Sequence, residues 1–332
     1  MVALTGDPIT AAARERARAG AWREVVRMLE PIADSRSTDA AFVTLYGEAL
    51  VRTGREREAV DWLHATGPVL ANGGDGASYR RVLNLLGVAL FALGDLDGAA
   101  HAFERALELA NRAEDLLVMA RATNNLGAIA NLRGEHDAAQ WHYGLAIPIY
   151  QRLGEPRGLA ESHHNLAITC RDRGRLAEAD EHERRAIDYA LVAEAPRLVA
   201  MGRVGRAEVA LRRGDPALAE ATARAAAADL NRLADPSNEA DAYRLIGVAA
   251  AARNEFIAAG AAFERALGLA RMHHHALVEA ETLRDRAAAR LESGDTHGAV
   301  EDGREALTLF ARLGAREEIA VIEKWLNNLL RA

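Results

Sequence analysis

The sequence repeats itself with a period of 40 residues over most of its length, and this period limits the folds that the chain can adopt. A residue typical of turns recurs at one phase of the period, and alanine recurs five and twelve residues later. The turn residues are Gly94, Gly134, Gly174, Gly214, Asn254 and Gly294. The alanines are Ala99, Ala139, Ala179, Ala219, Ala259 and Ala299, then Ala106, Ala146, Ala186, Ala226, Ala266 and Ala306. Such a register indicates one structural unit used many times.

Each unit has the pattern of two α-helices joined by a tight turn. A glycine or asparagine after an apolar run permits the left-handed conformation at which a helix ends. An acidic residue such as Asp95 or Glu135 usually follows, and it suits the positive end of the next helix dipole. The small residues let the two helices approach closely, while larger ones such as Leu86 and Phe103 fill the layer between them. Because one hairpin cannot cover its own apolar face, neighbours must stack. The sequence therefore predicts an all-α fold, an α-solenoid of about seventeen helices and no strand.

Two stretches of the repeat resemble a known family. LLGVALFALGDLDGAAHAFERALELA and NLGAIANLRGEHDAAQWHYGLAIPIY are similar to tetratricopeptide repeats. The usual repeat of that family is 34 residues long, so this array resembles the longer form found in kinesin light chains and in bacterial regulators. The resemblance implies a right-handed superhelix of stacked antiparallel hairpins that binds other proteins.

The array divides into four parts along the chain. Two shorter hairpins are expected in residues 1–70, where Gly20 and Gly54 lie 34 apart, and a flexible connector at 71–79. Six 40-residue hairpins follow over 80–314, which makes about eight hairpins in all, and a C-terminal capping helix occupies 315–332. The capping helix carries an apolar stripe at helical spacing, which favours either packing on the last hairpin or a homodimer contact. The stripe consists of Ile319, Ile322, Trp325, Leu326 and Leu329.

Composition excludes several classes of protein. The net charge of −7 and a pI near 5.9 disfavour nucleic-acid binding, which needs a basic face. No apolar run approaches the ~20 residues of a membrane span, and the first residues lack the apolar core of a signal peptide. Cys170 is the only cysteine, so there is no disulfide framework. We therefore expect a cytoplasmic protein that binds neither nucleic acid nor membrane.

Motifs of catalysis are missing from the sequence. It contains no glycine-rich phosphate loop, no GxSxG and no nucleophile next to an oriented base. The run His182-Glu183-Arg184-Arg185-Ala186 lacks the second histidine of a zinc-binding HExxH. His273, His274 and His275 are adjacent, so their side chains would point in different directions on a helix. We expect no catalytic residue, no metal site and no cofactor.

The resemblance also implies a binding surface, since tetratricopeptide repeats hold ligands on one face of the first helix of each hairpin. The residues that match this face are Arg81, Asn84, Arg121, Asn124, Asn125, Asn131, Glu161, His164, Asn165 and Arg171. Asn125 and Asn165 match an asparagine that contacts the main chain of bound peptides in long-repeat relatives. The arginines favour an acidic protein or peptide segment. The alternative is that the asparagines satisfy neighbouring helix ends or face water.

The fifth and sixth hairpins depart from the repeat. Gly202 and Gly205 fall within a helix, where each costs roughly 0.5–1 kcal/mol relative to alanine. Arg206 stands at a position of core leucine, and Glu183 stands where other hairpins have an aromatic ring. These substitutions predict a thin core and an inner layer that is rearranged or partly solvated.

The sequence thus favours a non-catalytic scaffold that binds a protein or peptide in its concave groove. Two other classes stay open. One is the ligand- or peptide-sensing module of a bacterial signalling or transcription system, and the other is an enzyme with its site in the groove.

Overall fold

The computed structural model describes residues 8–329, which form seventeen α-helices, two short 3₁₀-helices and no strand. The predicted all-α fold of helical hairpins is confirmed. Among these residues no helix combines the length and the hydrophobicity that crossing a lipid bilayer requires. The chain divides into two compact units, one ending at Gly158 and the other beginning at Leu159.

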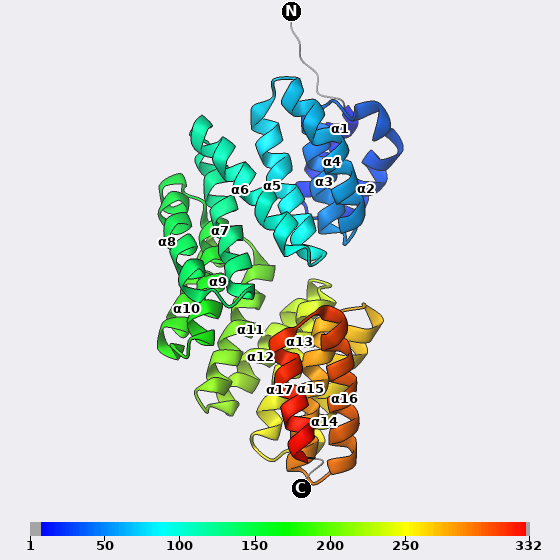
Figure 1. The fold of residues 1–332 in the computed structure, drawn as a ribbon, viewed down its shortest axis with the longest axis vertical. Helices are drawn as coiled ribbons and strands as arrows, with labels where there is room; N and C mark the ends of the chain where they lie inside the picture. The colour runs from blue at the N-terminus through cyan, green and yellow to red at the C-terminus, as the bar shows by residue number, and fades with distance from the viewer. Residues whose placement is uncertain (1–7, 330–332) are drawn as a thin grey trace, which may run out of the picture. The chain divides into compact units, whose positions relative to one another are not determined.

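The first unit contains four helical hairpins. Its α-helices are α1 (Pro8–Arg18), α2 (Trp22–Leu29), α3 (Ala40–Arg52), α4 (Glu56–Asn72), α5 (Gly76–Ala92), α6 (Leu96–Ala113), α7 (Leu116–Leu132) and α8 (His136–Leu153). The 3₁₀-helices Glu30–Ile32 and Asp34–Arg36 connect α2 to α3. Figure 1 shows α3 to α6, coloured blue to cyan, packed side by side, and each helix contacts the next one in the chain.

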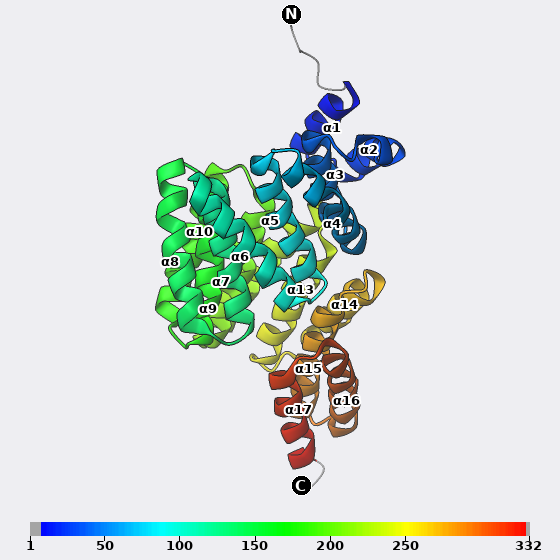
Figure 2. The ribbon, with the colours of Figure 1, turned by 45° about the horizontal axis from the view of Figure 1, so that its top comes forward.

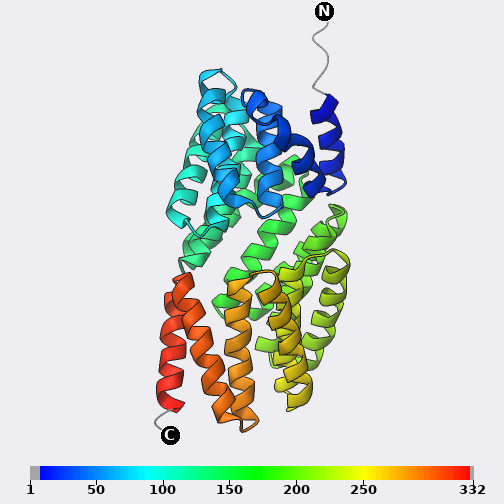
Figure 3. The same cartoon turned by 90° about the vertical axis from the view of Figure 1, so that its right-hand side faces the viewer.

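The second unit contains the other four hairpins and a single last helix. Its helices are α9 (Pro156–Asp172), α10 (Leu176–Val192), α11 (Pro196–Arg212), α12 (Pro216–Arg232), α13 (Pro236–Ala251), α14 (Phe256–Met272), α15 (Ala276–Glu292), α16 (Thr296–Leu313) and α17 (Arg316–Leu329). The first turn of α9 precedes the boundary between the units. In Figure 3 the helices from α14 to α17, amber to red, follow one another side by side.

Two series of left-handed residues set the hairpin geometry. All six predicted turn residues, from Gly94 to Gly294, have φ between 62° and 90°. A second series with the same period lies between hairpins, and the sequence does not reveal it because most of its members are not residue types typical of turns. Its members are Glu114, Gly154, Glu194, Ala234, His274 and Gly314. A side chain in this conformation costs about 1–2 kcal/mol, so the stacking of helices on either side must offset it.

The aspartates after the turns cap the next helix with their side chains, whereas Glu135 and Glu255 do not. Asp95, for example, accepts a hydrogen bond from the backbone N–H of Gly98 at 2.9 Å. The carboxylates of Asp75, Asp115, Asp215, Asp235 and Asp295 do the same for the helices that follow them. Each bond satisfies one backbone donor that the first turn of a helix leaves unpaired.

The two helices of three hairpins meet where an aromatic ring lies on a glycine. A Cβ atom placed on Gly247 would lie 2.6 Å from the ring of Phe263, which is fully buried. The same contact joins Gly87 to Phe103 and Gly127 to Tyr143. In these three hairpins the close approach of the second helix requires a glycine seven positions before the turn.

The last hairpin has Gly303 at the aromatic position, and the C-terminal helix fills the space. A Cβ atom on Gly303 would lie 2.8 Å from the Trp325 ring and 3.0 Å from Leu326. Leu326 and Ile322 are buried against the last two hairpins. Figure 2 shows α17, in red, running beside α16. This packing supports the capping interpretation, because a dimer contact through the stripe would require these side chains to leave the core.

The break predicted at 71–79 is shorter in the structure. Helix α4 extends to Asn72 and α5 begins at Gly76, so only a three-residue turn separates them. Asp75 caps α5 by accepting from Ser78 N–H at 3.0 Å, which fixes the start of the helix three residues before Tyr79. The glycines that suggested a long connector instead form the same kind of turn as elsewhere, with Gly74 at φ 83°.

Because of the ring-on-glycine contact, the effect of a glycine-to-alanine substitution on stability depends on the position of the glycine. Gly247→Ala should destabilise the protein by about 1–3 kcal/mol, because the new methyl group meets the Phe263 ring. Gly268→Ala is the matched control, since nothing lies within 4 Å of its Cβ position on the neighbouring helix α14. The control should stabilise by up to about 1 kcal/mol through helix propensity. Urea unfolding of the two variants measures the change in the free energy of unfolding for each. A stabilised Gly247→Ala variant would contradict the close contact.

Candidate functional site

The predicted binding residues lie on three first helices. Helix α5 carries Arg81 and Asn84, and α7 carries Arg121, Asn124, Asn125 and Asn131, all in the first unit. Helix α9 carries Glu161, His164, Asn165 and Arg171 in the second unit. The predicted binding residues thus form two sets, one in each unit.

Two of the predicted asparagines in the first unit contact each other. Asn125 Nδ2 lies 3.4 Å from Asn84 Oδ1 and donates to it, which joins the faces of α5 and α7. Both side chains are partly exposed. An amide group has two donor hydrogens and an acceptor oxygen with two lone pairs, so this long bond leaves most of the hydrogen-bonding capacity of each amide unused.

Arg81 and Arg121 lie one period apart on the same two helices and are exposed. Within the described residues neither guanidinium has a carboxylate close enough for an ion pair. Hydrogen bonds from Ser78 are the main cause that lowers the pKa of the nearby Asp75, and the charge of Arg81 adds to this effect. The first unit therefore presents two arginines beside two amides.

Asn124 is less accessible, and Asn131 is engaged within the protein. Asn124 is 5% exposed, because it is one residue before Asn125 and thus about 100° further around the helix. A ligand can reach its amide only if neighbouring side chains move. Asn131 Oδ1 lies 3.1 Å from His136 Nδ1 at the start of α8. This contact joins Asn131 to a side chain in the first turn of the next helix.

In the second unit the charge of Arg171 is balanced inside the protein. Its guanidinium forms ion pairs with Glu208 of α11 and, at 3.0 Å, with Asp172. The side chain is only 16% exposed. Arg171 therefore does not add the free positive charge that its sequence position suggested. Asn165 is partly exposed, and so is Glu161, which has interactions of its own within the protein.

His164 forms a buried pair with Glu183 of α10. Its Nδ1 atom lies 3.0 Å from Glu183 Oε2, and the carboxylate is 2% exposed. Burial raises the pKa of the Glu183 carboxyl, and the imidazole offsets this only in part. Burial also acts to lower the pKa of His164, but the nearby carboxylate outweighs it and holds that pKa above the ordinary value. His164 thus has a role in the core, at the edge of the predicted face.

Gly205 of the sixth hairpin makes room for this carboxylate, since a Cβ atom on it would overlap Glu183 Oε1. Gly202 makes room for Ile187 on the same helix as Glu183, at 2.7 Å from the position of its Cβ atom. Arg206 pairs with Asp180 of α10 at 3.0 Å. The inner layer is therefore rearranged around buried charges rather than solvated, and the departures from the repeat in the fifth and sixth hairpins are parts of one arrangement.

The neighbouring histidines form a second internal pair. His163 Nδ1 lies 3.1 Å from His182 Nδ1, and the His163 ring stacks on Tyr189 with centroids 5.6 Å apart. Burial lowers the pKa of His163 to about 4, with the charges of His182 and Arg185 acting in the same direction. Burial lowers the pKa of His182 as well. Both rings are therefore neutral at pH 7.

The run of three histidines and the single cysteine occupy turn and core positions. His273 ends α14, His274 takes the left-handed turn conformation and His275 precedes α15. Burial raises the pKa of the Cys170 thiol, which makes it less reactive. Among the residues that the structure describes, no three His, Cys, Asp or Glu side chains are grouped to hold a metal ion.

Comparison with protein families identifies the repeat. Residues 80–113 and 118–191 match two family models, each described as a tetratricopeptide repeat. These matches fall on α5 to α6 and on α7 to α10. A search of curated proteins found no significant match.

Solved structures share the fold at low sequence identity. A Rap protein complexed with competence and sporulation factor aligns with a TM-score of 0.68 and 15% identity over 97% of each chain. The apo form of the quorum sensor NprR from B. thuringiensis aligns with a TM-score of 0.57 and 11% identity, also over 97% of each chain. A signal-transduction ATPase with a tetratricopeptide repeat sensor, from Pyrococcus horikoshii, gives 0.59 and 15% over 91% of this chain and 45% of its own. At these identities the likeness establishes the helical-repeat architecture.

The low pKa of His163 predicts a loss of stability in acid. As pH falls from 6.5, the unfolded chain binds a proton on this histidine, whereas the folded protein does not until about pH 4. Stability should therefore fall over this window. His163→Phe keeps a ring against Tyr189 but cannot be protonated, so its melting temperature should fall less between pH 7 and pH 4.5.

Thermal melts across this pH range measure the two slopes. His297→Gln is the control, because that side chain is 87% exposed. Parallel curves for the wild type and His163→Phe would mean that the folded protein protonates His163 as readily as the unfolded chain does.

Proposed function

Because residues 80–113 and 118–191 are tetratricopeptide repeats, we propose that the chain is a non-catalytic scaffold that binds a protein or peptide segment. The binding surface is the polar face of the first helices, centred in the first unit on Asn84 and Asn125. His163 and His164 are engaged inside the second unit, with His182 and Glu183 respectively.

The contact between Asn84 and Asn125 carries the proposal. A peptide main chain presents one N–H donor and one C=O acceptor at nearly every residue. Amides on successive helices, with unused donors and acceptors, match this alternation without selecting particular side chains. Packing alone does not require such a pair of amides. At the position equivalent to Asn125, the preceding hairpin has Leu85.

The two arginines give the ligand its charge. Arg81 and Arg121 are exposed on the helices that carry the amides, and neither is neutralised by an ion pair within the described residues. An acidic segment is therefore the expected ligand of the first unit. Since Arg171 is paired with Glu208 and Asp172, the second unit adds little to this preference.

A regulatory role is the second candidate. The similar structures include a quorum sensor and a protein whose repeats are named as a sensor. In such a role the same surface would receive a signal rather than a permanent partner. The fold alone supports this reading, and ligand affinity together with any change of conformation on binding would distinguish it.

The amide pair can be tested with a phage-displayed library of random peptides. Peptides selected on the wild type should be rich in Asp and Glu, and one of them, labelled for fluorescence anisotropy, gives a Kd. Asn84→Ala/Asn125→Ala should weaken binding at least tenfold, because each lost hydrogen bond to a desolvated main chain costs about 1–3 kcal/mol and 1.4 kcal/mol is a factor of ten. The melting temperature should barely move, since the amides contact each other only at 3.4 Å.

Asn111→Ala is the control, because Asn111 is an exposed asparagine on the second helix α6. Asn165→Ala reports separately on the second unit. An unchanged Kd in a folded Asn84→Ala/Asn125→Ala variant would remove the first-helix face as the binding surface.

A further inference from the structure

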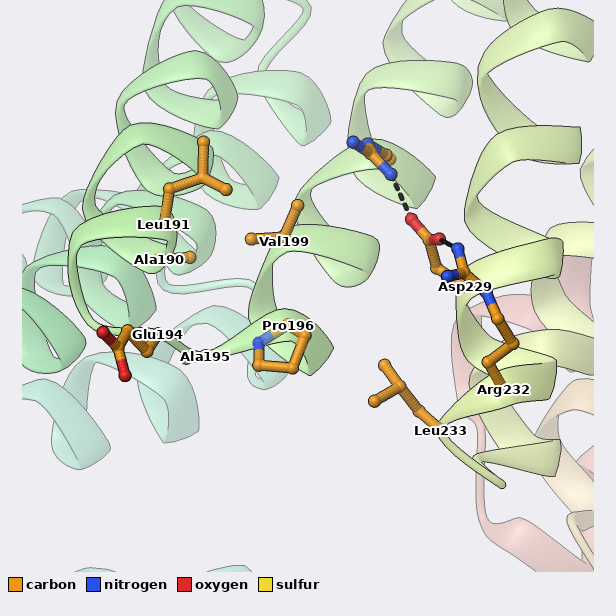
Figure 4. A pocket seen from close by; sticks show the side chains of 10 residues that line it. Ala190, Leu191, Glu194, Ala195, Pro196, Val199, Asp229, Arg232 and Leu233 are labelled. Atoms are coloured by element: carbon orange, nitrogen blue, oxygen red, sulfur yellow. Dashed lines mark hydrogen bonds and ion pairs between the residues drawn. The ribbon is translucent and has the colours of Figure 1, made fainter.

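A separate pocket lies in the second unit, away from the predicted binding residues. It has a volume of about 410 Å³ and lies between the C-terminal ends of α10 and α12, over the start of α11. In Figure 4 Leu191 and Glu194 lie on one side of the pocket and Pro196 and Val199 in the middle. Asp229, Arg232 and Leu233 lie on the other side. This volume falls within the range of small-ligand sites, which are mostly apolar with a few polar groups that orient the ligand.

The polar end of the pocket is a departure from the repeat. Arg203 of α11 and Asp229 of α12 form an ion pair within the sixth hairpin. The other 40-residue hairpins hold uncharged side chains at these two positions. Their pairs are Leu83 and Leu109, Thr123 and Ile149, His163 and Tyr189, Tyr243 and Leu269, and Leu283 and Leu309.

In the other hairpins these pairs belong to the core. Leu83 with Leu109, Tyr243 with Leu269 and Leu283 with Leu309 each pack in one apolar cluster. A partly buried ion pair at such a place is seldom more stable than a well-packed apolar pair. Stability therefore does not account for Arg203 and Asp229, and a local conflict with the fold is typical of a functional position.

The charges at this end do not balance. Asp229 receives hydrogen bonds from both Arg203 and Arg232, so two guanidinium groups share one carboxylate. A guanidinium group has five N–H donors. Within the described residues Arg203 donates one hydrogen bond, to Asp229, and Arg232 donates to Asp229 and to the carbonyl of Ala228. One positive charge and several donors are left at this end of the pocket, where Arg203 is 38% and Arg232 76% exposed. The other carboxylate that lines the pocket, Glu194, comes from the turn before α11.

We propose that this pocket binds a small apolar carboxylate. Its carboxylate lies against Arg203 and Arg232, where planar guanidinium groups match its geometry, and its hydrocarbon part lies on Pro196, Val199 and Leu233. Such a group is supplied either by a free aliphatic acid or by the C-terminal residue of a peptide that ends in an apolar side chain. This site is independent of the proposed peptide face of the first unit.

Binding is measured by isothermal titration of the whole chain with octanoate and with its uncharged analogue octanamide. A second pair of probes is acetyl-Gly-Gly-Leu with a free or an amidated C-terminus. At least one carboxylate should bind saturably and at least tenfold more tightly than its amide, and the tighter of the two carboxylates identifies the source. Equal affinity for carboxylate and amide, or no saturable binding of either carboxylate, would overturn the proposal.

The repeat itself supplies the decisive variant. Arg203→Leu/Asp229→Leu installs the apolar pair of the first and last 40-residue hairpins, so its melting temperature should be equal to or higher than that of the wild type. It should lose at least tenfold in carboxylate affinity. Arg232→Gln should also weaken binding, while Arg224→Leu is the control, because Arg224 pairs with Glu220 on the same helix α12 and does not line the pocket. Undiminished carboxylate binding by the folded double variant would place the ligand elsewhere.

Discussion

The contact of an aromatic ring with a glycine backbone governs how the hairpins are built. Where Phe103, Tyr143 or Phe263 is present, the facing first helix has a glycine and the two helices approach closely. Where the ring is absent, the space is used differently. Glu183 enters it as a carboxylate paired with His164, and Gly303 leaves it to Trp325 from the last helix. The different packing of the fifth and eighth hairpins therefore follows from substitutions at this one position of the repeat.

Much of the fold could be predicted from the sequence because its signals are local. A glycine after an apolar run and an aspartate after the glycine act within one turn of helix, so the 40-residue period located the hairpins and the cap. The turns between hairpins escaped prediction, since Glu114, Glu194, Ala234 and His274 adopt positive φ only because the stacked helices on both sides require it. Their conformation is a tertiary effect that no local residue preference reveals.

For the candidate site, the sequence could predict the helix face on which the residues lie, but not the contacts that their side chains make. The period pairs Asn84 with Asn124, whereas in the structure Asn84 contacts Asn125 and Asn124 is buried. The sequence also could not show that Glu208 neutralises Arg171. Those facts depend on which side chain of the next hairpin stands opposite. The ion pair of Arg203 with Asp229 was missed for a related reason, since the two residues lie on different helices and neither belongs to a motif. Comparing equivalent positions across all six hairpins reveals it.

The two turn series have a consequence for how such a chain changes in evolution. Every 40-residue hairpin begins and ends in the same backbone conformation, so duplication or loss of a whole hairpin preserves the register of all the others. Arg203 and Asp229 belong to one hairpin and would be copied together, whereas Leu191 comes from the hairpin before. A duplicated sixth hairpin would thus contain the charged half of the pocket. The apolar residues that complete the pocket would depend on the hairpin that precedes the copy.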